Sequence, residues 1–214
     1  MKTTINCFIP FADAAQAEKT IQGLKSSNLV KDIYLLVTED TEVPLQGCRI
    51  LHVPALNSTA AMRIIAAHSD ADYTLFYTKY TTLKLGMFAL ERMTRIAEDS
   101  VAGMVYADHY QVSEGLPKNA PVIDYQFGSL RDDFNFGSVL LYKASALQEA
   151  VTRMKTDYQF AGLYDLRLKL SQKESLVHIN EYLYSEIEND TRKSGEKIFD
   201  YVDPKNRGVQ IEME

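Results

Sequence analysis

Short apolar runs alternate with segments of helical periodicity along the first half of the chain. Apolar stretches of strand length predict β-strands at 4–10, 32–37, 48–53, 73–77 and 103–108. Between them, apolar residues recur at helical spacing over 13–26, from Asn57 or Ser58 to 68, and over 85–98. Strands that alternate with helices in this way form mostly parallel sheets covered on both faces, so we expect an α/β fold.

The second half of the chain is less regular. The pattern predicts helices at 144–154 and 164–171 and strands at 138–142, 176–179 and 181–188. Between 111 and 137 the periodicity disappears, and Gly115, Pro117, Pro121 and Gly128 interrupt the segment. We interpret 111–137 as a long loop, and loops of that length in compact domains commonly carry function.

Composition narrows the class of protein. The chain has 214 residues, of which 46% are hydrophobic and 24% charged, enough for one domain with a sizeable core. Its net charge of -6 argues against nucleic acid as a partner, which would need a basic surface. Two cysteines, Cys7 and Cys48, form neither a disulfide framework nor a metal cluster. A reducing setting fits these cysteines, so we expect a cytoplasmic protein. No apolar run is long enough to be a transmembrane segment, and peripheral membrane contact is left open.

Candidate chemistry concentrates where the strand 73–77 gives way to a loop. In an open α/β sheet, ligands bind beyond the carboxyl ends of the strands. Neither a dinucleotide-binding glycine fingerprint nor a phosphate-binding P-loop occurs in the chain. A Ser-His-Asp or Cys-His hydrolase signature is missing as well.

Several segments together resemble a known family. Each lies in the matching order and spacing: Ile9-Pro10, 36–40, 56–67, 73–77, Val105-Tyr106-Ala107-Asp108, 135–143 and 161–168. Over residues 3–188 the chain resembles a family 2 glycosyltransferase of the GT-A fold. The resemblance implies a nucleotide-sugar donor, a glycan or lipid-linked sugar as the unknown acceptor, and inversion of the anomeric centre.

Two motifs of that family are absent. The family holds a divalent metal with Asp-x-Asp after the strand that matches 73–77, and here the positions read Thr78, Lys79 and Tyr80. Its Glu-Asp pair, which includes the general base, falls on Gly162 and Leu163. We therefore assign no metal ligands, and dependence on a divalent metal stays undecided at this point.

The resemblance also implies where the donor would bind. It places an acid of the turn after the second strand, Glu39 or Asp40, against the nucleotide base and ribose. Lys79 lies where the diphosphate would be, as a substitute cation or as an ordinary solvated lysine. The remaining residues expected at the donor site by their place in the matched segments are Pro10, Asn57, Arg63, Thr78 and Tyr80.

Four aspartates are candidates for catalysis. Asp108 ends a strand at the expected ligand edge, where it contacts the sugar, acts as base, or caps a turn. Asp132 and Asp133 lie in the long loop, as base, metal ligands or solvated carboxylates. Asp165 survives from the family's helix start, as base or as a helix-supporting residue.

These observations support one first hypothesis and two alternatives. The first is a glycosyltransferase domain over 1–190, with 191–214 as an extension leading into a further domain. The second is a degenerate GT-A domain that binds a nucleotide sugar or a partner protein without turnover. The third, a sugar-phosphate nucleotidyltransferase, lacks the glycine-rich, lysine-bearing start that it would need.

Overall fold

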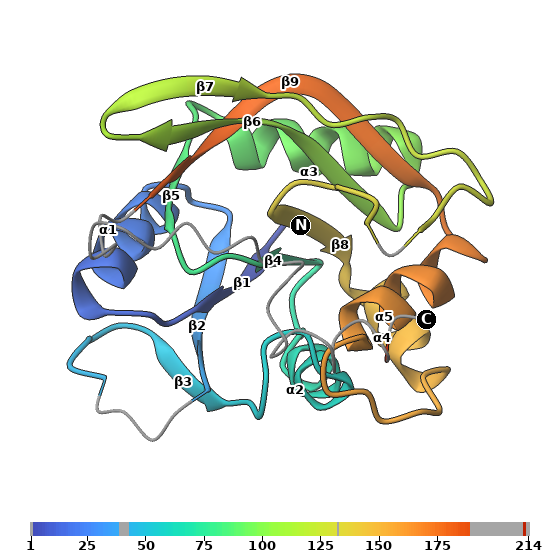
Figure 1. Cartoon of the computed structure of the whole chain (residues 1–214). Helices are drawn as coiled ribbons and strands as arrows, with labels where there is room; N and C mark the ends of the chain where they lie inside the picture. The colour runs from blue at the N-terminus through green and yellow to red at the C-terminus, as the bar shows by residue number, and fades with distance from the viewer. Residues whose placement is uncertain (1, 39–42, 132, 189–211, 213–214) are drawn as a thin grey trace.

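A computed structural model of the chain describes residues 2–38, 43–131, 133–188 and 212. Its elements, in chain order, are β1 (Ile5–Pro10), α1 (Ala14–Lys25), β2 (Val30–Val37), β3 (Arg49–His52), α2 (Thr59–Ala67), β4 (Tyr73–Tyr77), β5 (Thr82–Leu85), α3 (Ala89–Ser100), β6 (Met104–Ser113), β7 (Leu116–Ala120), β8 (Val139–Lys143), α4 (Ala144–Thr152), α5 (Gly162–Ser171) and β9 (Leu176–Ile187). The strands form one sheet in the order β3-β2-β1-β4-β8-β6-β9-β5, and β7 pairs with β6 (Figure 1).

The sheet contains both parallel and antiparallel pairs. Pairing is parallel across β3, β2, β1 and β4, and again between β6 and β9. Strand β8 runs antiparallel to both β4 and β6. Strands β1, β2, β4 and β6 therefore point the same way, and their carboxyl ends open on the same edge of the sheet, where ligands bind in folds of this kind.

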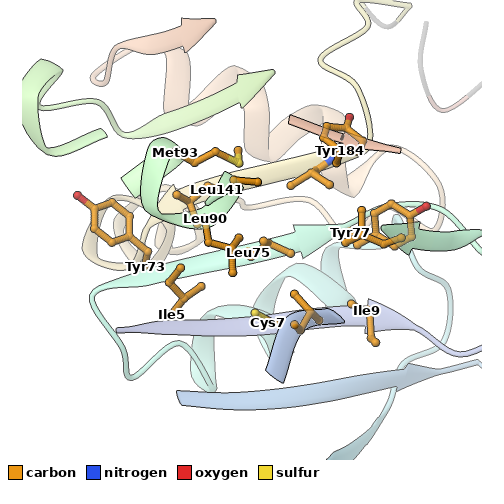
Figure 2. Close-up of a cluster of buried hydrophobic side chains, with 14 of the residues drawn as sticks. Ile5, Cys7, Ile9, Tyr73, Leu75, Tyr77, Leu90, Met93, Leu141 and Tyr184 are labelled. Atoms are coloured by element: carbon orange, nitrogen blue, oxygen red, sulfur yellow. Dashed lines mark hydrogen bonds between the residues drawn. The ribbon is translucent and has the colours of Figure 1, made fainter. Parts of the chain in front are cut away.

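Alternating residues of the central strands build two cores. On β1, Ile5, Cys7 and Ile9 face one side, while Phe8 faces the other. Helices α1 and α3 cover the first side, and α2, α4 and α5 cover the second. Figure 2 shows the first core, in which side chains of β1, β4 and β8 meet Leu90 and Met93 of α3. Both faces of the sheet are thus covered, which confirms the α/β prediction.

Three details correct the sequence-based prediction. The segment 111–137 is not all loop: β6 continues to Ser113, and β7 pairs with it over 116–120. The helix expected at 85–98 begins at Ala89, because 82–85 forms β5. The two strands expected at 176–179 and 181–188 are one strand, β9, whose register against β6 shifts at a bulge beside Asp108.

Local polar contacts explain where two helices begin. The side chain of Asp13 accepts from the Gln16 N–H ahead of α1, and Ser58 accepts from the Ala61 N–H ahead of α2. Ser58 is therefore the cap of the two residues that the sequence offered. Within the described residues, no helix is both long and apolar enough to cross a bilayer. The expected extension 191–214 lies, apart from Glu212, outside the described residues.

Candidate functional site

The segment Thr78–Tyr80 follows β4 directly at the carboxyl edge of the sheet. The Thr78 N–H donates to the carbonyl of Ser138 at 2.9 Å, which ties this segment to the residue before β8. Thr78 is half-buried, and Lys79 and Tyr80 are exposed. The segment is therefore at the surface of the expected ligand edge, accessible to a ligand rather than packed into a core.

Lys79 has a carboxylate partner. Its ammonium group donates to Oε2 of Glu186 at 2.6 Å, and the Glu186 side chain is only 4% exposed. The other carboxylate oxygen lies 3.2 Å from Nε2 of His109, itself 2% exposed. The positive charge that the resemblance places near a diphosphate is thus largely balanced by a buried acid, although the lysine itself remains at the surface.

The phenol of Tyr184 hydrogen-bonds the backbone next to Thr78, at Ser138 and Val139. Its oxygen accepts from the backbone N–H groups of Ser138 at 2.8 Å and Val139 at 3.3 Å, and its ring stacks on His109 at 4.9 Å. Burial raises the pKa of Tyr184 to about 12, so the phenol stays protonated. Gly137, with a φ of 73°, lies so close to this hydroxyl that any β-carbon there would collide with it.

Burial lowers the pKa of His109. The Glu186 carboxylate opposes this shift, and the Lys79 charge adds a smaller lowering. The unfolded chain then takes up a proton near the ordinary histidine pKa of about 6.5, while the folded chain does so only at lower pH. We therefore expect stability to fall as pH decreases below about 6.5.

Urea midpoints at pH 7.5 and 5.5 measure this loss. A His109→Gln variant should lose less stability over the same interval, because the other three histidines and all the carboxylates are shared with the parent chain. Equal losses in the two proteins would show that His109 does not carry the effect.

Asp108 belongs to a second network, on the other side of β6. It is 1% exposed, and its Oδ1 accepts from the Val122 N–H at 2.8 Å and contacts Nε2 of His178 at 2.9 Å. The other ring nitrogen of His178 lies 2.6 Å from Oδ1 of Asp124. Neutral imidazole can donate only one of these two hydrogen bonds, whereas imidazolium donates both. His178 thus links a buried carboxylate to one that is 83% exposed.

Asp124 opens onto a cavity of about 710 Å³ formed by the segment after β7. Its polar lining includes Asp124, Gln126, Ser129, Arg131, Asp133 and Asn135. Asp133, expected as a base, pairs there with Arg131 at 3.4 Å. Another cavity, of about 620 Å³, lies between α1, β5 and the start of α3, and none of the residues predicted for the site line it.

The other predicted residues, Asn57, Arg63 and Asp165, lie on or next to α2 and α5. The carbonyl of Asn57 accepts from the Leu163 N–H at 3.0 Å. Arg63 pairs with Asp157 and also donates to the Met154 carbonyl at 3.2 Å. Asp165, in the first turn of α5, pairs with Lys169 at 3.2 Å.

Gly162 explains why this junction is tight. A β-carbon at Gly162 would lie 2.8 Å from the Asn57 carbonyl oxygen, and closer still to backbone atoms of Ser58 and Thr59. Backbone atoms cannot move away as the end of a side chain can. The position that the resemblance matches to the glutamate of the Glu-Asp pair therefore has no room for an acidic side chain.

The structure thus distributes the predicted residues over three places. Pro10, the buried end of β1, and Thr78–Tyr80 lie at strand ends. Asp133 lines the 710 Å³ cavity, whereas Asp108 lies within β6 and contacts that segment through the Val122 N–H. Asn57, Arg63 and Asp165 lie at the α2–α5 junction. Glu39, Asp40 and Asp132 lie outside the described residues.

Sequence reasoning missed His178, Asp124, Glu186 and Tyr184. All four act through contacts to residues far along the chain, such as the 54 positions between Asp124 and His178. Among the described residues, no group of three or more His, Cys, Asp or Glu side chains is arranged to hold a metal ion. Thr78, Lys79 and Tyr80 offer no carboxylate either, so the residues present do not fit a divalent ion at the family's position, and no step is assigned to one.

The sheet order and the helices on both faces of the sheet match a GT-A fold. Comparison with solved structures supports this directly. S. aureus TarS 1-349 matches over 86% of this chain and 60% of its own length, with a TM-score of 0.61 and 8% identity. The same protein in complex with UDP-GlcNAc matches over 89% and 60%, with a TM-score of 0.63 and 7% identity. In complex with UDP, the match covers 87% and 61%, with a TM-score of 0.61 and 8% identity.

These matches confirm the resemblance at the level of fold. The chain spans about three fifths of the length of the TarS 1-349 structures. No family model matches the chain. No curated protein matches it either.

Proposed function

We propose that this chain is a glycosyltransferase domain that binds a nucleotide sugar at the ends of β1 and β4 and transfers the sugar to a carbohydrate acceptor. The observation that carries the proposal is the match over 89% of the chain to a protein captured with UDP-GlcNAc. The accessible Thr78–Tyr80 segment supports it, because it lies where ligands bind in open α/β sheets. Transfer would be an inverting displacement, as the resemblance implies.

Thermal unfolding with UDP-GlcNAc tests the binding step. Ligand at 100 times its dissociation constant should stabilise the chain by roughly 2.7 kcal/mol. Since the family's metal carboxylates are replaced, we expect the same shift with manganese as with a chelator. N-Acetylglucosamine alone is the control for the nucleotide part of the donor. No shift with UDP-GlcNAc or other nucleotide sugars would contradict the proposal.

A matched pair of variants tests the role of Lys79. Lysine binds a phosphate as a point charge, so Lys79→Gln should reduce the UDP-GlcNAc shift. Lys84 is an exposed lysine on β5, and Lys84→Gln should leave the UDP-GlcNAc shift unchanged. Equal effects of the two changes would mean that Lys79 lies away from the diphosphate.

The second candidate is a domain that binds the donor without turnover. Two observations favour it: Glu186 balances the charge of Lys79, and Leu163 stands at the position matched to the family's base. Release of UDP from UDP-GlcNAc separates the candidates, because a binding module would show the thermal shift and release no UDP.

A further inference from the structure

We propose that the 710 Å³ cavity holds the acceptor sugar, and that Asp124 takes the proton from its attacking hydroxyl. This inference rests on the proposed glycosyl transfer and adds to it a site and a base. A different base is needed because a leucine, Leu163, stands at the position that the resemblance matches to the family's base. General bases contribute roughly 100- to 10,000-fold to such reactions.

Buried side chains hold Asp124 in place. Its carboxylate contacts His178 at 2.6 Å, and the His178 ring is 6% exposed and stacks on Tyr106 at 5.2 Å. Asp108 contacts the far nitrogen of that ring, so His178 is fixed from both ends. A loop carboxylate that is 83% exposed would ordinarily sample many positions. Asp124 is instead held in one position by its contact with the buried His178 ring.

The backbone on either side of Asp124 is anchored as well. Asp108 accepts from the Val122 N–H at 2.8 Å. The Tyr106 hydroxyl donates to the Ile123 carbonyl at 2.9 Å and accepts from the Tyr125 N–H at 2.7 Å. Two buried residues of β6 therefore hold the loop from 122 to 125, and Asp124 is presented outward from a rigid base, as a catalytic group requires.

The cavity has the chemistry of a sugar site. Amide, hydroxyl and guanidinium groups from Gln126, Asn135, Ser129 and Arg131 line it. Such groups donate and accept hydrogen bonds with the hydroxyls of a sugar ring. Its volume of about 710 Å³ lies in the usual range for small-molecule sites.

The cavity also lies close to the expected donor edge. Asn135 lines the cavity, and Ser138, three residues later, accepts the hydrogen bond from Thr78. Three residues of extended chain span at most roughly 10 Å. An acceptor in the cavity and a donor at Thr78–Tyr80 would therefore be near neighbours.

The step balances without a further reagent. The acceptor O–H bond breaks and its proton passes to Asp124. The acceptor oxygen forms a bond to the anomeric carbon of the donor. The bond from that carbon to the diphosphate oxygen breaks, and its electron pair leaves with the nucleoside diphosphate. In this assignment Asp108 and His178 are positioning residues, because neither needs to touch the acceptor.

Two other aspartates fit the role of base less well. Asp133 lines the same cavity, but its partner is the exposed Arg131 rather than a buried group. Asp165 pairs with Lys169 on its own helix, at the α2–α5 junction. Only Asp124, among the described aspartates, is both exposed to the cavity and held by a buried chain of contacts.

UDP release from UDP-GlcNAc, with water as acceptor, tests the assignment in the full chain. Asp124→Asn should lower kcat at least about 100-fold while the donor KM stays within about twofold. Asp99→Asn, an exposed aspartate on α3, should leave kcat unchanged. Formate should partly restore activity to Asp124→Ala, because a small carboxylate can fill the vacated position.

Further variants test the positioning residues. His178→Gln keeps one donor and should lose less kcat than His178→Phe, with donor KM unchanged in both. Asp108→Asn should lower kcat at constant KM, and should change the pH profile of kcat. Thermal unfolding of each variant establishes that it is folded before its kinetics are compared.

The outcomes separate the inference from the proposed function. If the parent chain releases UDP and Asp124→Asn retains full kcat, or if loss follows Asp133→Asn alone, Asp124 is not the base. If the parent chain binds UDP-GlcNAc and releases no UDP, the inference is overturned and the binding module stands. If it binds no nucleotide sugar, the proposed function itself is wrong.

Discussion

Gly162→Ala is expected to destabilise the chain by about 2–3 kcal/mol, because the added carbon would overlap backbone atoms of α2. For a chain of this length, such a loss lowers the melting temperature by roughly 5–10 °C. The overlap involves the Asn57 carbonyl and the backbone of Ser58 and Thr59, none of which can turn aside. Differential scanning calorimetry of the purified variant measures the change directly.

Gly23→Ala is the matched control. Gly23 lies within α1, and a β-carbon there meets no atom within 4 Å. Alanine in a helix is more favourable than glycine by about 0.5–1 kcal/mol, so this variant should melt slightly higher than the parent. If the two substitutions shift the melting temperature alike, the α2–α5 junction is looser than the structure indicates.

An acidic side chain at Gly162, the position matched to the glutamate of the family's Glu-Asp pair, should disrupt the junction for the same reason. The packing of α5 against the start of α2 therefore leaves no room for a glutamate at this position, and Leu163 stands at the position matched to the base.

Tyr184→Phe is expected to lower the free energy of unfolding by about 1–3 kcal/mol, because it leaves two buried N–H groups without their acceptor. Those groups belong to Ser138 and Val139, and phenylalanine keeps the stacking on His109. The effect should also reach the ligand edge, since the Ser138 carbonyl holds Thr78. Urea unfolding measures the loss of stability, and amide exchange at Thr78 measures its local consequence.

Tyr182→Phe provides the comparison. Tyr182 lies on the same strand, β9, and its ring stacks on Tyr110. Its exposure is intermediate, and removing its hydroxyl should change stability by less than about 0.5 kcal/mol. A Tyr184→Phe protein as stable as Tyr182→Phe would mean that water or a local shift satisfies both N–H groups.

The fold was largely predictable, because buried parallel strands leave a strong local signal. β1 and β4 are continuous apolar runs, and α1 and α3 carry their apolar residues at helical spacing. Strand β7 left no such signal. Its residues, Leu116–Ala120, include a proline and stay mostly exposed, and only pairing with β6 makes them a strand.

The site was less predictable, because its contacts join distant parts of the chain. Lys79 could be recognised as a candidate substitute cation, but its pairing with a carboxylate depends on Glu186, 107 positions later. Asp108 was predicted to end a strand, but it lies within β6, which continues to Ser113, and its contact with His178 arises from the pairing of β6 with β9. Local patterns predict which edge of the sheet would bind a ligand, but they do not show which charges at that edge are already paired.

Strand β9 has a consequence for how the chain acquires its structure. It lies between β6 and β5, and Thr82 of β5 pairs with Ile187 at its end. During synthesis, β5 must wait for about a hundred further residues before its partner leaves the ribosome. Until then, β6 lacks its parallel neighbour, and the Lys79–Glu186 and Asp108–His178 contacts cannot form. Both polar networks therefore depend on β9 and can form only once that strand has paired with β6.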